Sequence, residues 1–445
     1  MQKRLLILII LILPGFAVLK SQQDTTAADV YTLEEAIATA KRNNSELVNA
    51  KLDKLKAEKK VSEVYNQNLI PTITLSSQYA RAIKKQVFDI NFGGVNQRFE
   101  IGSDNTITNT LQVSEPIPIL GTPVFEGIKI ADYYSALQGE NVNSTEAKIT
   151  SDVTQAYNNV LFMKEVVNVR KQNLKNAEEN YDVVEKKYRN GTSTEFDFLR
   201  AKVTVENLKP PVLESENNLV ITKKILKNAI GVKDTNDIDV TGELKFDSTE
   251  VYGSTDDLIN KISENNVSIR QLKINQDINK QLLNIDKANY LPKLYIFGQY
   301  NLQAQENDGR TIGEYRFFNV LNAGLGLSWD LNFIRNTYKK QQTEIDIKKT
   351  DETISDVKQK LRLTAQSIIL KMDEARTKVK ATFETVKMAE RGYDLAALSF
   401  KNGVVSQIDV LDAGTQLSNS RLAYYGAIVE YLNAKADLER LLERK

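Results

Sequence analysis

The chain has 445 residues, and its 59 basic and 58 acidic side chains give a net charge of +1, so no overall field attracts nucleic acid. It contains neither Cys nor His, which excludes disulfides, thiolate nucleophiles, imidazole catalysis and most zinc sites. We therefore expect no enzyme: no catalytic residue, no metal site and no cofactor. Nucleic acid is not an expected partner.

The N-terminus has the pattern of an export signal. A basic start (MQKR) precedes the unbroken apolar run of residues 5–13, and a helix breaker and small or polar residues follow. Residues 1–22 are therefore predicted to be a signal peptide. The alternative is an uncleaved membrane anchor, for which the apolar run is short. No later segment is apolar enough for a membrane-spanning helix, so the mature chain is predicted to act outside the cytoplasm.

The mature sequence divides into two related halves, residues 23–245 and 246–445. The segment TLEEAIATAKRNNSEL at Thr32–Leu47 recurs as STDDLINKISENNVSI at Ser254–Ile269, with the Asn-Asn pair at the same place. In both halves a polar helical stretch then ends at a proline, and beyond it the period changes from helical to two. Each half is therefore predicted to contain a helix, two strands joined by a loop, a long helix, an Asn-Gly break and a further helix.

Four strands are predicted, at residues 71–82, 106–115, 292–304 and 317–331. In the last of them, small or polar residues alternate with an apolar face formed by Leu321, Ala323, Leu325, Leu327 and Trp329. A half-buried strand of a soluble sandwich is the alternative, but such a sandwich needs more strands than these. The small, polar second face instead favours a water-lined barrel whose exterior contacts lipid.

A long helix with a coiled-coil repeat follows the strands in each half. Apolar residues alternate at intervals of four and three from Ile149 to Tyr188, with Arg170 the only charged member, and again from Ala365 to Phe400. A mean spacing of 3.5 residues is typical of coiled coils. A helix that begins soon after the strands would hold about 65 residues and be on the order of 100 Å long. No compact globular domain accommodates two such helices.

Both coiled-coil patterns end at a duplicated motif. YRNGTSTEFDFLRA at Tyr188–Ala201 and FKNGVVSQIDVLDA at Phe400–Ala413 place an aromatic residue, Asn-Gly and Asp-x-Leu-x-Ala at matching positions. Asn-Gly suits a left-handed helix C-cap, and a new helix starts a few residues later. Residues 188–196 and 400–408 are therefore predicted to be the tips of two helical hairpins.

The residues after each Asn-Gly pair include candidate caps for the next helix. Thr192 or Ser193 can cap it in the first copy, and Ser406 can cap it in the second, because their hydroxyls can accept the free N–H groups of a first helical turn.

These features resemble the TolC family of outer-membrane efflux proteins. The resemblance rests on the paired tip motifs, on the Asn-Asn helices before Pro71 and Pro292, and on the LKNAIGV ending of the first half. It implies a mainly α fold with a membrane β-barrel: long coiled-coil hairpins form a periplasmic tunnel, and a homotrimer shares one 12-stranded barrel with four strands from each chain.

The same resemblance implies the function. The chain would be the exit duct, in the outer membrane of a Gram-negative cell, of a tripartite efflux or type I secretion system. Its partners would be two further copies of itself, outer-membrane lipid, a periplasmic adaptor (membrane fusion) protein and an inner-membrane RND or ABC transporter.

The number of strands also requires an oligomer. Four strands cannot close a barrel, and an open strand edge cannot face lipid. Two copies would give eight strands, whose interior side chains would fill, whereas three copies give twelve strands and room for a channel. Four copies remain possible from the sequence alone.

By the resemblance, Asp409 and Asp412 would surround the pore at its periplasmic constriction, and Asp197 would help to hold the tip closed. The alternative for each is a solvated carboxylate near a helix N-terminus, where the helix dipole favours it. Family members with a latched closed state often have Tyr at the position of Phe400 and Arg at that of Val405. Both polar partners are missing here, which makes the carry-over to Asp197 weak, although Asp197 stays with Asp409 and Asp412 among the predicted constriction residues.

The resemblance also assigns Gly191, Gly403, Asn190 and Asn402 to the tips that contact the adaptor. Trp329 ends the last predicted strand on its periplasmic side and is expected in the aromatic belt at the membrane interface. The loops within the two strand pairs are expected outside the cell.

Two alternatives to the duct stay open. One is a periplasmic coiled-coil structural protein without a pore. The other is a secreted carboxylate-dependent enzyme, such as a glycosidase with an Asp/Glu pair, but the best carboxylate pair lies on a narrow helical tip and not in a pocket.

Overall fold

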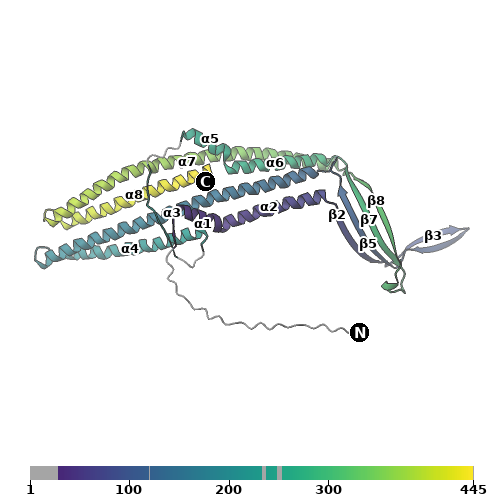
Figure 1. Ribbon diagram of the computed structural model, residues 1–445, viewed down its shortest axis with the longest axis horizontal. Coiled ribbons are helices and arrows are strands. Elements are labelled where there is room, and N and C mark those ends of the chain that lie inside the picture. The colour runs from purple at the N-terminus through teal and green to yellow at the C-terminus, as the bar shows by residue number, and fades with distance from the viewer. Residues whose placement is uncertain (1–28, 120, 233–236, 248–252, 444–445) are drawn as a thin grey trace, which may run out of the picture.

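The computed structural model describes residues 29–119, 121–232, 237–247 and 253–443. In chain order, the elements of these residues are β1 (Asp29–Tyr31), α1 (Leu33–Asn43), α2 (Ser45–Leu69), β2 (Thr72–Arg81), β3 (Gln86–Phe92), β4 (Val95–Ile101), β5 (Asn105–Pro116), α3 (Val124–Arg189), α4 (Glu195–Ile230), β6 (Ile238–Val240), α5 (Thr255–Asn265), α6 (Val267–Ala288), β7 (Lys293–Glu306), the 3-10 turn η1 (Ile312–Glu314), β8 (Phe317–Ser328), α7 (Phe333–Lys401) and α8 (Gln407–Leu442). Figure 1 shows an elongated molecule with helical hairpins at one end and strands at the other. The predicted fold class, mainly α with long hairpins and a barrel-forming set of strands, is confirmed.

Four strands form one antiparallel sheet in the order β2-β5-β7-β8. The register places Leu75 opposite Leu111, Leu111 opposite Tyr300, and Tyr300 opposite Leu321, so one row of side chains crosses the whole sheet on a single face. The four strands expected from the sequence lie within three residues of these bounds at every end. In the described part of the chain, β2 and β8 are the edges of this sheet.

The expectation of a plain loop between β2 and β5 is wrong. β3 and β4 form a separate antiparallel hairpin there, and the hairpin projects beyond the four-stranded sheet (Figure 1). Its two-residue turn is Gly93-Gly94, with φ of 60° and 91°. A tight hairpin turn of this kind needs left-handed residues, which glycine supplies. The sequence signal is the alternation of apolar residues on both sides of the Gly-Gly pair.

α3 and α7 are continuous helices of 66 and 69 residues. At 1.5 Å per residue, each is about 100 Å long. The predicted heptads agree with burial: Val153, Val160 and Val184 in α3 are at most 1% exposed. In α7 the buried positions end at Val379, and the pattern continues half-buried as far as Phe400. Among the described residues, no helix is long and apolar enough to cross a bilayer.

The order of the packed helices changes along the molecule. Next to the sheet, the neighbours run α2-α3-α6-α7, and at the far end they run α4-α3-α8-α7. The long helices α3 and α7 belong to both halves of this arrangement (Figure 1). In the described residues, a first-repeat helix therefore forms one edge at each level, and α7 forms the other.

Two hydrophobic clusters lie where this order changes. The first packs α1, β1 and β6 against α3, α4 and α8 around Leu226 and Ile428, both fully buried. The second packs α5 against α7 and α8 around Ile262, Ala365 and Leu438. The duplicated short helices α1 and α5 thus pack on the middle of the long helices.

Candidate functional site

The first tip joins α3 to α4 through a left-handed glycine. Asn190 is the C-cap of α3, and Gly191 follows with φ of 72°. The Gly191 N–H donates to the carbonyl of Tyr188 at 2.9 Å, which closes the end of the helix. The predicted C-cap therefore lies where the motif places it.

The residue that begins α4 differs from the prediction. Thr194 is the N-cap, and its hydroxyl accepts the N–H of Asp197 at 3.1 Å. Thr192 cannot fill this role because its N–H and its hydroxyl both donate to the carbonyl of Lys187, at 2.8 and 3.0 Å. The prediction of Thr192 or Ser193 as the cap is therefore wrong: Thr192 still belongs to the C-terminal closure of α3.

The second tip repeats this geometry between α7 and α8. Asn402 is the C-cap, Gly403 has φ of 77°, and the Gly403 N–H donates to the carbonyl of Phe400 at 3.0 Å. Ser406 is the N-cap of α8, as predicted, and its N–H donates to Oδ2 of Asp409 at 2.8 Å. The two tips therefore share one backbone path.

Both tips require glycine because of the backbone conformation and not because of steric crowding. A Cβ added to Gly191 or Gly403 would meet no described atom within 4 Å, yet both residues have a φ that L side chains rarely adopt. A β-branched residue in the left-handed region costs about 1–2 kcal/mol.

Two of the three predicted aspartates take part in helix caps. Asp409 accepts from the N–H and hydroxyl of Ser406, at 2.8 and 2.7 Å, and these bonds hold the pKa of Asp409 below its usual value. Asp412 is exposed one turn further along α8. Asp197 accepts from the hydroxyl of Thr194 at 2.7 Å within its own tip. The assignment of these carboxylates to a pore constriction stays a prediction.

A lysine that the sequence analysis does not single out connects the two tips. Nζ of Lys187 donates to the carbonyl of Phe400 at 3.1 Å and lies 4.1 Å from the centroid of its ring. The carbonyl belongs to the last turn of α7 and also accepts from the Gly403 N–H at 3.0 Å, so the lysine adds a second donor to the end of this helix. The sequence signal for this contact is weak: it consists of a basic residue one turn before the first Asn-Gly pair and an aromatic residue at the end of the second coiled-coil repeat.

Two buried amide side chains of the distal helices lack a hydrogen-bond partner in the described part of the chain. Asn180 of α3 and Gln407 of α8 are 7% and 5% exposed, and their side-chain amides have no hydrogen-bond partner among the described residues. A cavity of about 50 Å³ lies beside Asn180 and is also lined by Tyr393 and Gly414. A polar cavity of this size can hold ordered water.

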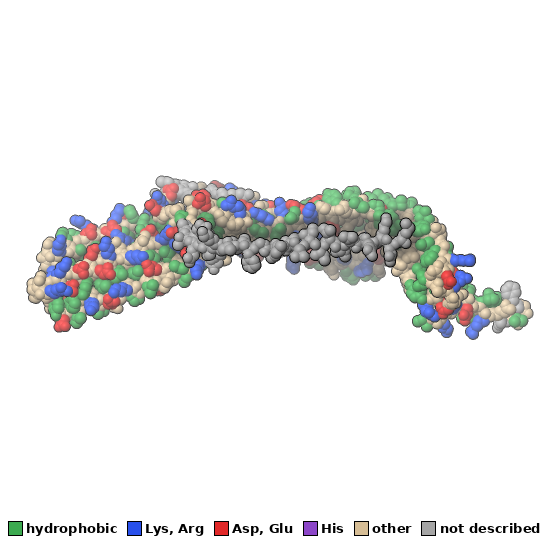
Figure 2. Space-filling model, turned by 60° about the horizontal axis from the view of Figure 1, so that its bottom comes forward, with side chains coloured by type: hydrophobic (Ala, Val, Ile, Leu, Met, Phe, Trp, Pro, Cys, Tyr) green, Lys and Arg blue, Asp and Glu red, His purple; other side chains and the backbone are tan. Residues whose placement is uncertain are grey.

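At the opposite end, the sheet has two chemically different faces. The register gathers large apolar residues on one face, namely Ile73, Leu75, Leu111, Val113, Ile296, Tyr300, Leu321, Leu325 and Leu327. They are exposed in the single chain, from 37% for Val113 to 76% for Leu75. On the other face, β2 and β5 carry Thr, Ser and Gln at most positions. Figure 2 shows hydrophobic side chains gathered at the sheet end and charges of both signs over the distal helices.

Trp329 lies at the junction of this sheet with α7. Its Nε1 donates to the carbonyl of Tyr290 at 3.1 Å, and its ring meets that of Phe333 edge to face at 6.2 Å. The side chain is half exposed, which suits an interfacial aromatic residue, although its place in a membrane interface stays a prediction.

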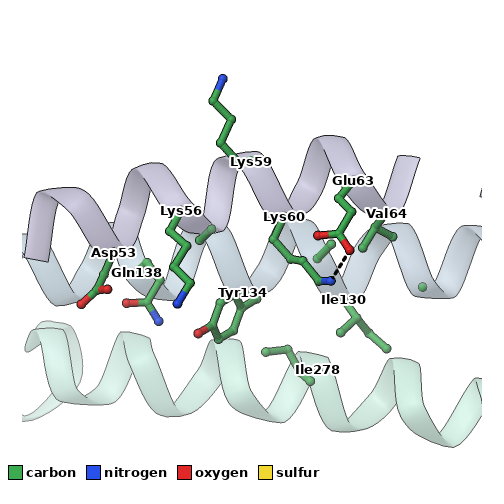
Figure 3. Close-up of a pocket in the computed structure, with 13 residues that line it drawn as sticks. Asp53, Lys56, Lys59, Lys60, Glu63, Val64, Ile130, Tyr134, Gln138 and Ile278 are labelled. Atoms are coloured by element: carbon green, nitrogen blue, oxygen red, sulfur yellow. Dashed lines mark hydrogen bonds and ion pairs between the residues drawn. The ribbon is translucent and has the colours of Figure 1, made fainter. Parts of the chain in front are cut away.

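A groove of about 890 Å³ lies between α2, α3 and α6. Figure 3 shows Lys60 and Glu63 of α2 paired along one side, Tyr134 and Ile130 of α3 along its floor, and Ile278 of α6 opposite. The groove contains none of the predicted site residues. Within the described chain, no cluster of acidic side chains could hold a metal ion.

Comparison with known proteins agrees with this geometry. A model of the family described as outer membrane efflux protein matches residues 36–232 and 258–443. Outer membrane protein TolC of Escherichia coli K12 is 25% identical over 204 residues, which are 45% of this chain and 40% of that protein. Outer membrane protein TolC of Vibrio cholerae is 21% identical over 306 residues, 65% of this chain and 66% of that protein. The chain thus matches less than two thirds of the length of each relative.

A solved structure shows the same fold. The CmeC outer membrane channel of Campylobacter jejuni superposes with a TM-score of 0.72 at 16% identity, covering 98% of this chain and 93% of CmeC. At this identity the likeness establishes the fold, while function must be argued from the residues.

Proposed function

We propose, because the chain belongs to the outer membrane efflux protein family, that copies of it close into a ring that forms a channel. The strands would line a pore through the outer membrane, and the helices would continue it as a tunnel into the periplasm. The channel would act as the exit duct of an efflux or type I secretion system. The observation that carries this proposal is that, among the described residues, two opposite edges of the chain are unpaired in the sheet and in the helices on either side of its middle.

Within the part of the chain that the structure describes, the same two edges are unpaired in the sheet, in the helices beside the sheet and in the distal helices. In the described residues, the sheet ends at β2 and β8, the helices beside it end at α2 and α7, and the distal helices end at α4 and α7. The first-repeat edge is always the opposite side from the second-repeat edge. A contact between unlike edges is head-to-tail, and such contacts form a ring when the rotation between copies closes and an open filament when it does not. Closure is needed because an open strand edge cannot lie in lipid.

The helical edges carry exposed apolar residues that a neighbouring copy would cover. On α4 they are Phe196, Leu199, Val203 and Leu213, and on α7 they are Leu363, Leu370, Met388 and Leu395. Each of these side chains is between 48% and 67% exposed in the single chain. Large exposed apolar stripes of this kind are typical of interaction surfaces.

The size of the barrel favours three copies. Each chain contributes four strands in a continuous antiparallel order, so β8 of one copy can pair with β2 of the next. Two copies would give a barrel whose interior side chains fill it, whereas three give twelve strands and an open lumen. A homotrimer is therefore the smallest ring that supports a channel.

The hairpin tips form the end of the channel that would contact the periplasmic partner. They lie at the far end of the molecule from the sheet (Figure 1), where Asn190-Gly191 and Asn402-Gly403 form the turns. A periplasmic adaptor would contact these turns, and an inner-membrane RND or ABC transporter would deliver the substrate. Asp409 and Asp412 would form two stacked acidic rings around the axis, which favour cations.

The proposal is tested with detergent-purified protein in planar bilayers. We expect a heat-sensitive trimer on gels, discrete conductance steps, and a reversal potential across a salt gradient that indicates cation selectivity. A trimer without conductance would contradict the duct and support the structural coiled-coil protein instead.

Two neighbouring substitutions on β8 provide a matched control. Leu325→Arg places a charge on the apolar face, where it costs about 2–4 kcal/mol in lipid, so we expect little assembled trimer. Asn322→Arg places the same charge on the polar face, so we expect normal assembly and weaker cation selectivity. Equal assembly of the two variants would contradict the assignment of the faces to lipid and water.

A further inference from the structure

The β3–β4 hairpin projects beyond the sheet and is anchored at its base. At its base, Lys85 forms an ion pair with Asp104 at 2.8 Å and donates to Asn307 at 2.9 Å. The N–H of Asp308 donates to Asp104 at 3.0 Å, and Arg81 pairs with Asp308 at 2.7 Å. The base of the hairpin is therefore tied to the loop between β7 and β8.

The hairpin has one apolar face and one polar face. The register places Phe88 opposite Phe99, and Ile90, Val95 and Ile101 share their face. All five apolar side chains are exposed, from 43% for Phe88 to 62% for Val95.

The opposite face of the same hairpin is charged. There the register pairs Val87 with Glu100 and Asp89 with Arg98, and Arg98 and Asp89 form an ion pair at 3.5 Å. A two-stranded hairpin is only marginally stable alone in water, and contiguous exposed apolar patches mark interaction sites. The apolar face therefore needs a covering surface.

We propose that the apolar faces of these hairpins, one from each copy in the ring, pack against one another at the ring axis and form an outer constriction of the channel. The inference rests on the proposed ring, and the occupant of each face is a second copy of this chain.

Three observations favour copies of the chain over another occupant. The hairpin leaves the sheet from β2, the edge strand that meets the neighbouring copy, so its position is continuous with the proposed interface. Ring symmetry brings every copy of the hairpin to the same height around one axis. The segment from Lys84 to Asp104 contains three basic and three acidic residues, so the copies do not repel one another.

The consequence for transport is an apolar barrier at the outer mouth. Rings of apolar side chains can close a pore by excluding water from a narrow section. Substrate would leave when the hairpins separate. This constriction is distinct from the acidic one proposed at the tips, because the two lie at opposite ends of the molecule (Figure 1).

Cysteine cross-linking tests the contact directly, since the chain has no native Cys. Phe99→Cys and Ile101→Cys lie on the apolar face, and Arg98→Cys is the matched control on the polar face. In outer membranes oxidised with copper-phenanthroline, we expect covalent dimers of Phe99→Cys and Ile101→Cys to exceed those of Arg98→Cys several-fold. Equal cross-linking of all three variants would overturn the proposal.

Labelling with an aqueous maleimide separates copies of the chain from lipid as the occupant. We expect the thiol of the Phe99→Cys variant to label several-fold more slowly than that of the Arg98→Cys variant, both in membranes and in purified trimer in detergent. Protection in membranes that is lost in detergent, while the trimer persists, would overturn the proposal in favour of lipid. Fast labelling in both would overturn it outright.

Conductance measurements distinguish a failure of the hairpin contact from a failure of the ring itself. Heat-sensitive trimer and conductance are measured on the same samples, so failure of the ring is seen independently. Replacement of residues 86–101 by a short Gly-Ser turn should leave the trimer intact and raise conductance several-fold. An intact trimer with unchanged conductance would contradict an outer constriction.

Discussion

The two hairpin tips share a backbone path but are stabilised by different contacts. In the first tip, Phe198 of α4 stacks on Tyr188 of α3 with ring centroids 5.1 Å apart and lies 5.7 Å from Tyr181. In the second tip, Phe400 instead contacts Lys187 of the first through its ring and its carbonyl. The first tip is therefore stabilised within itself, and the second partly by the first.

This difference indicates which tip loses a contact when the two hairpins separate. The amide of Asn180 has no partner among the described residues and lies beside a cavity lined by both hairpins, so separating the hairpins exposes a group that water can satisfy. Displacement of α7–α8 relative to α3–α4 would break the Lys187 contact but leave the aromatic packing of the first tip intact. We therefore predict that separation of the hairpins loosens the second tip more than the first.

The largest expected effect is a destabilisation of the first tip when its aromatic packing is removed. Phe198→Ala should destabilise the α3–α4 tip by about 2 kcal/mol, less than for a fully buried Phe because the side chain is only half-buried. Hydrogen exchange of the first tip should accelerate by about 30-fold, since 1.4 kcal/mol corresponds to tenfold. Phe400→Ala is the control, and an equal acceleration of both tips by both substitutions would contradict the comparison.

Replacement of the glycine at either turn should have a similar cost, because both glycines have the same left-handed conformation. Gly191→Val and Gly403→Val should each cost about 1–2 kcal/mol and misdirect the following helix, whereas Gly403→Asn should be tolerated because Asn adopts left-handed conformations. The readout is cross-linking to the adaptor, with trimer formation unchanged. Normal adaptor cross-linking and export in Gly403→Val would show that the tips are not the docking surface.

A smaller effect is expected from the contact that joins the tips. Lys187→Met keeps the aliphatic stem but removes the charge, and should loosen the second tip by about 1 kcal/mol. We expect higher conductance in planar bilayers. Lys186→Met, at an exposed position next to it, is the matched control. If both variants conduct like the unmodified protein, Lys187 does not restrain the second tip.

The smallest expected effect is a pH dependence of the second tip. Because the pKa of Asp409 is held below its ordinary 3.8 by Ser406, its cap is complete above that value and is lost as the pH falls through the lowered pKa. The protection factors of amides in the first turn of α8, which correct for the intrinsic pH dependence of exchange, should therefore be lower at about pH 3 than at about pH 6, and Asp409→Asn should remove most of this difference. Crowding of carboxylates in a ring would instead raise the pKa. A titration of Asp409 above 3.8 would thus show that repulsion between copies outweighs the cap.

The parts of this molecule that could be predicted from sequence depend on local pattern. The heptads of α3 and α7 and the left-handed Gly191 and Gly403 follow from residue spacing and from backbone sterics. Thr194 was not predicted because choosing among three adjacent hydroxyl residues depends on how far the closure of α3 extends. Lys187 could not be predicted, because its contact with Phe400 joins residues 213 positions apart.

The β3–β4 hairpin was missed for a different reason. Its alternating apolar residues and Gly93-Gly94 turn are local signals, but an external loop was expected between the barrel strands. The exposure of its apolar face is explained by the proposed contact with neighbouring copies, and a single sequence does not describe such contacts.

A closed head-to-tail ring is tested most directly by pairing the two edge strands through introduced cysteines. Thr72, Thr74 or Ser76 of β2 is replaced by Cys together with Asn322→Cys of β8, and the covalent products are sized after oxidation in membranes. Ring closure predicts that at least one double variant gives a covalent ladder ending at three chains, while each single variant stays monomeric. Cross-linked dimers from the single variants, or a ladder that does not end at three chains, would contradict the ring.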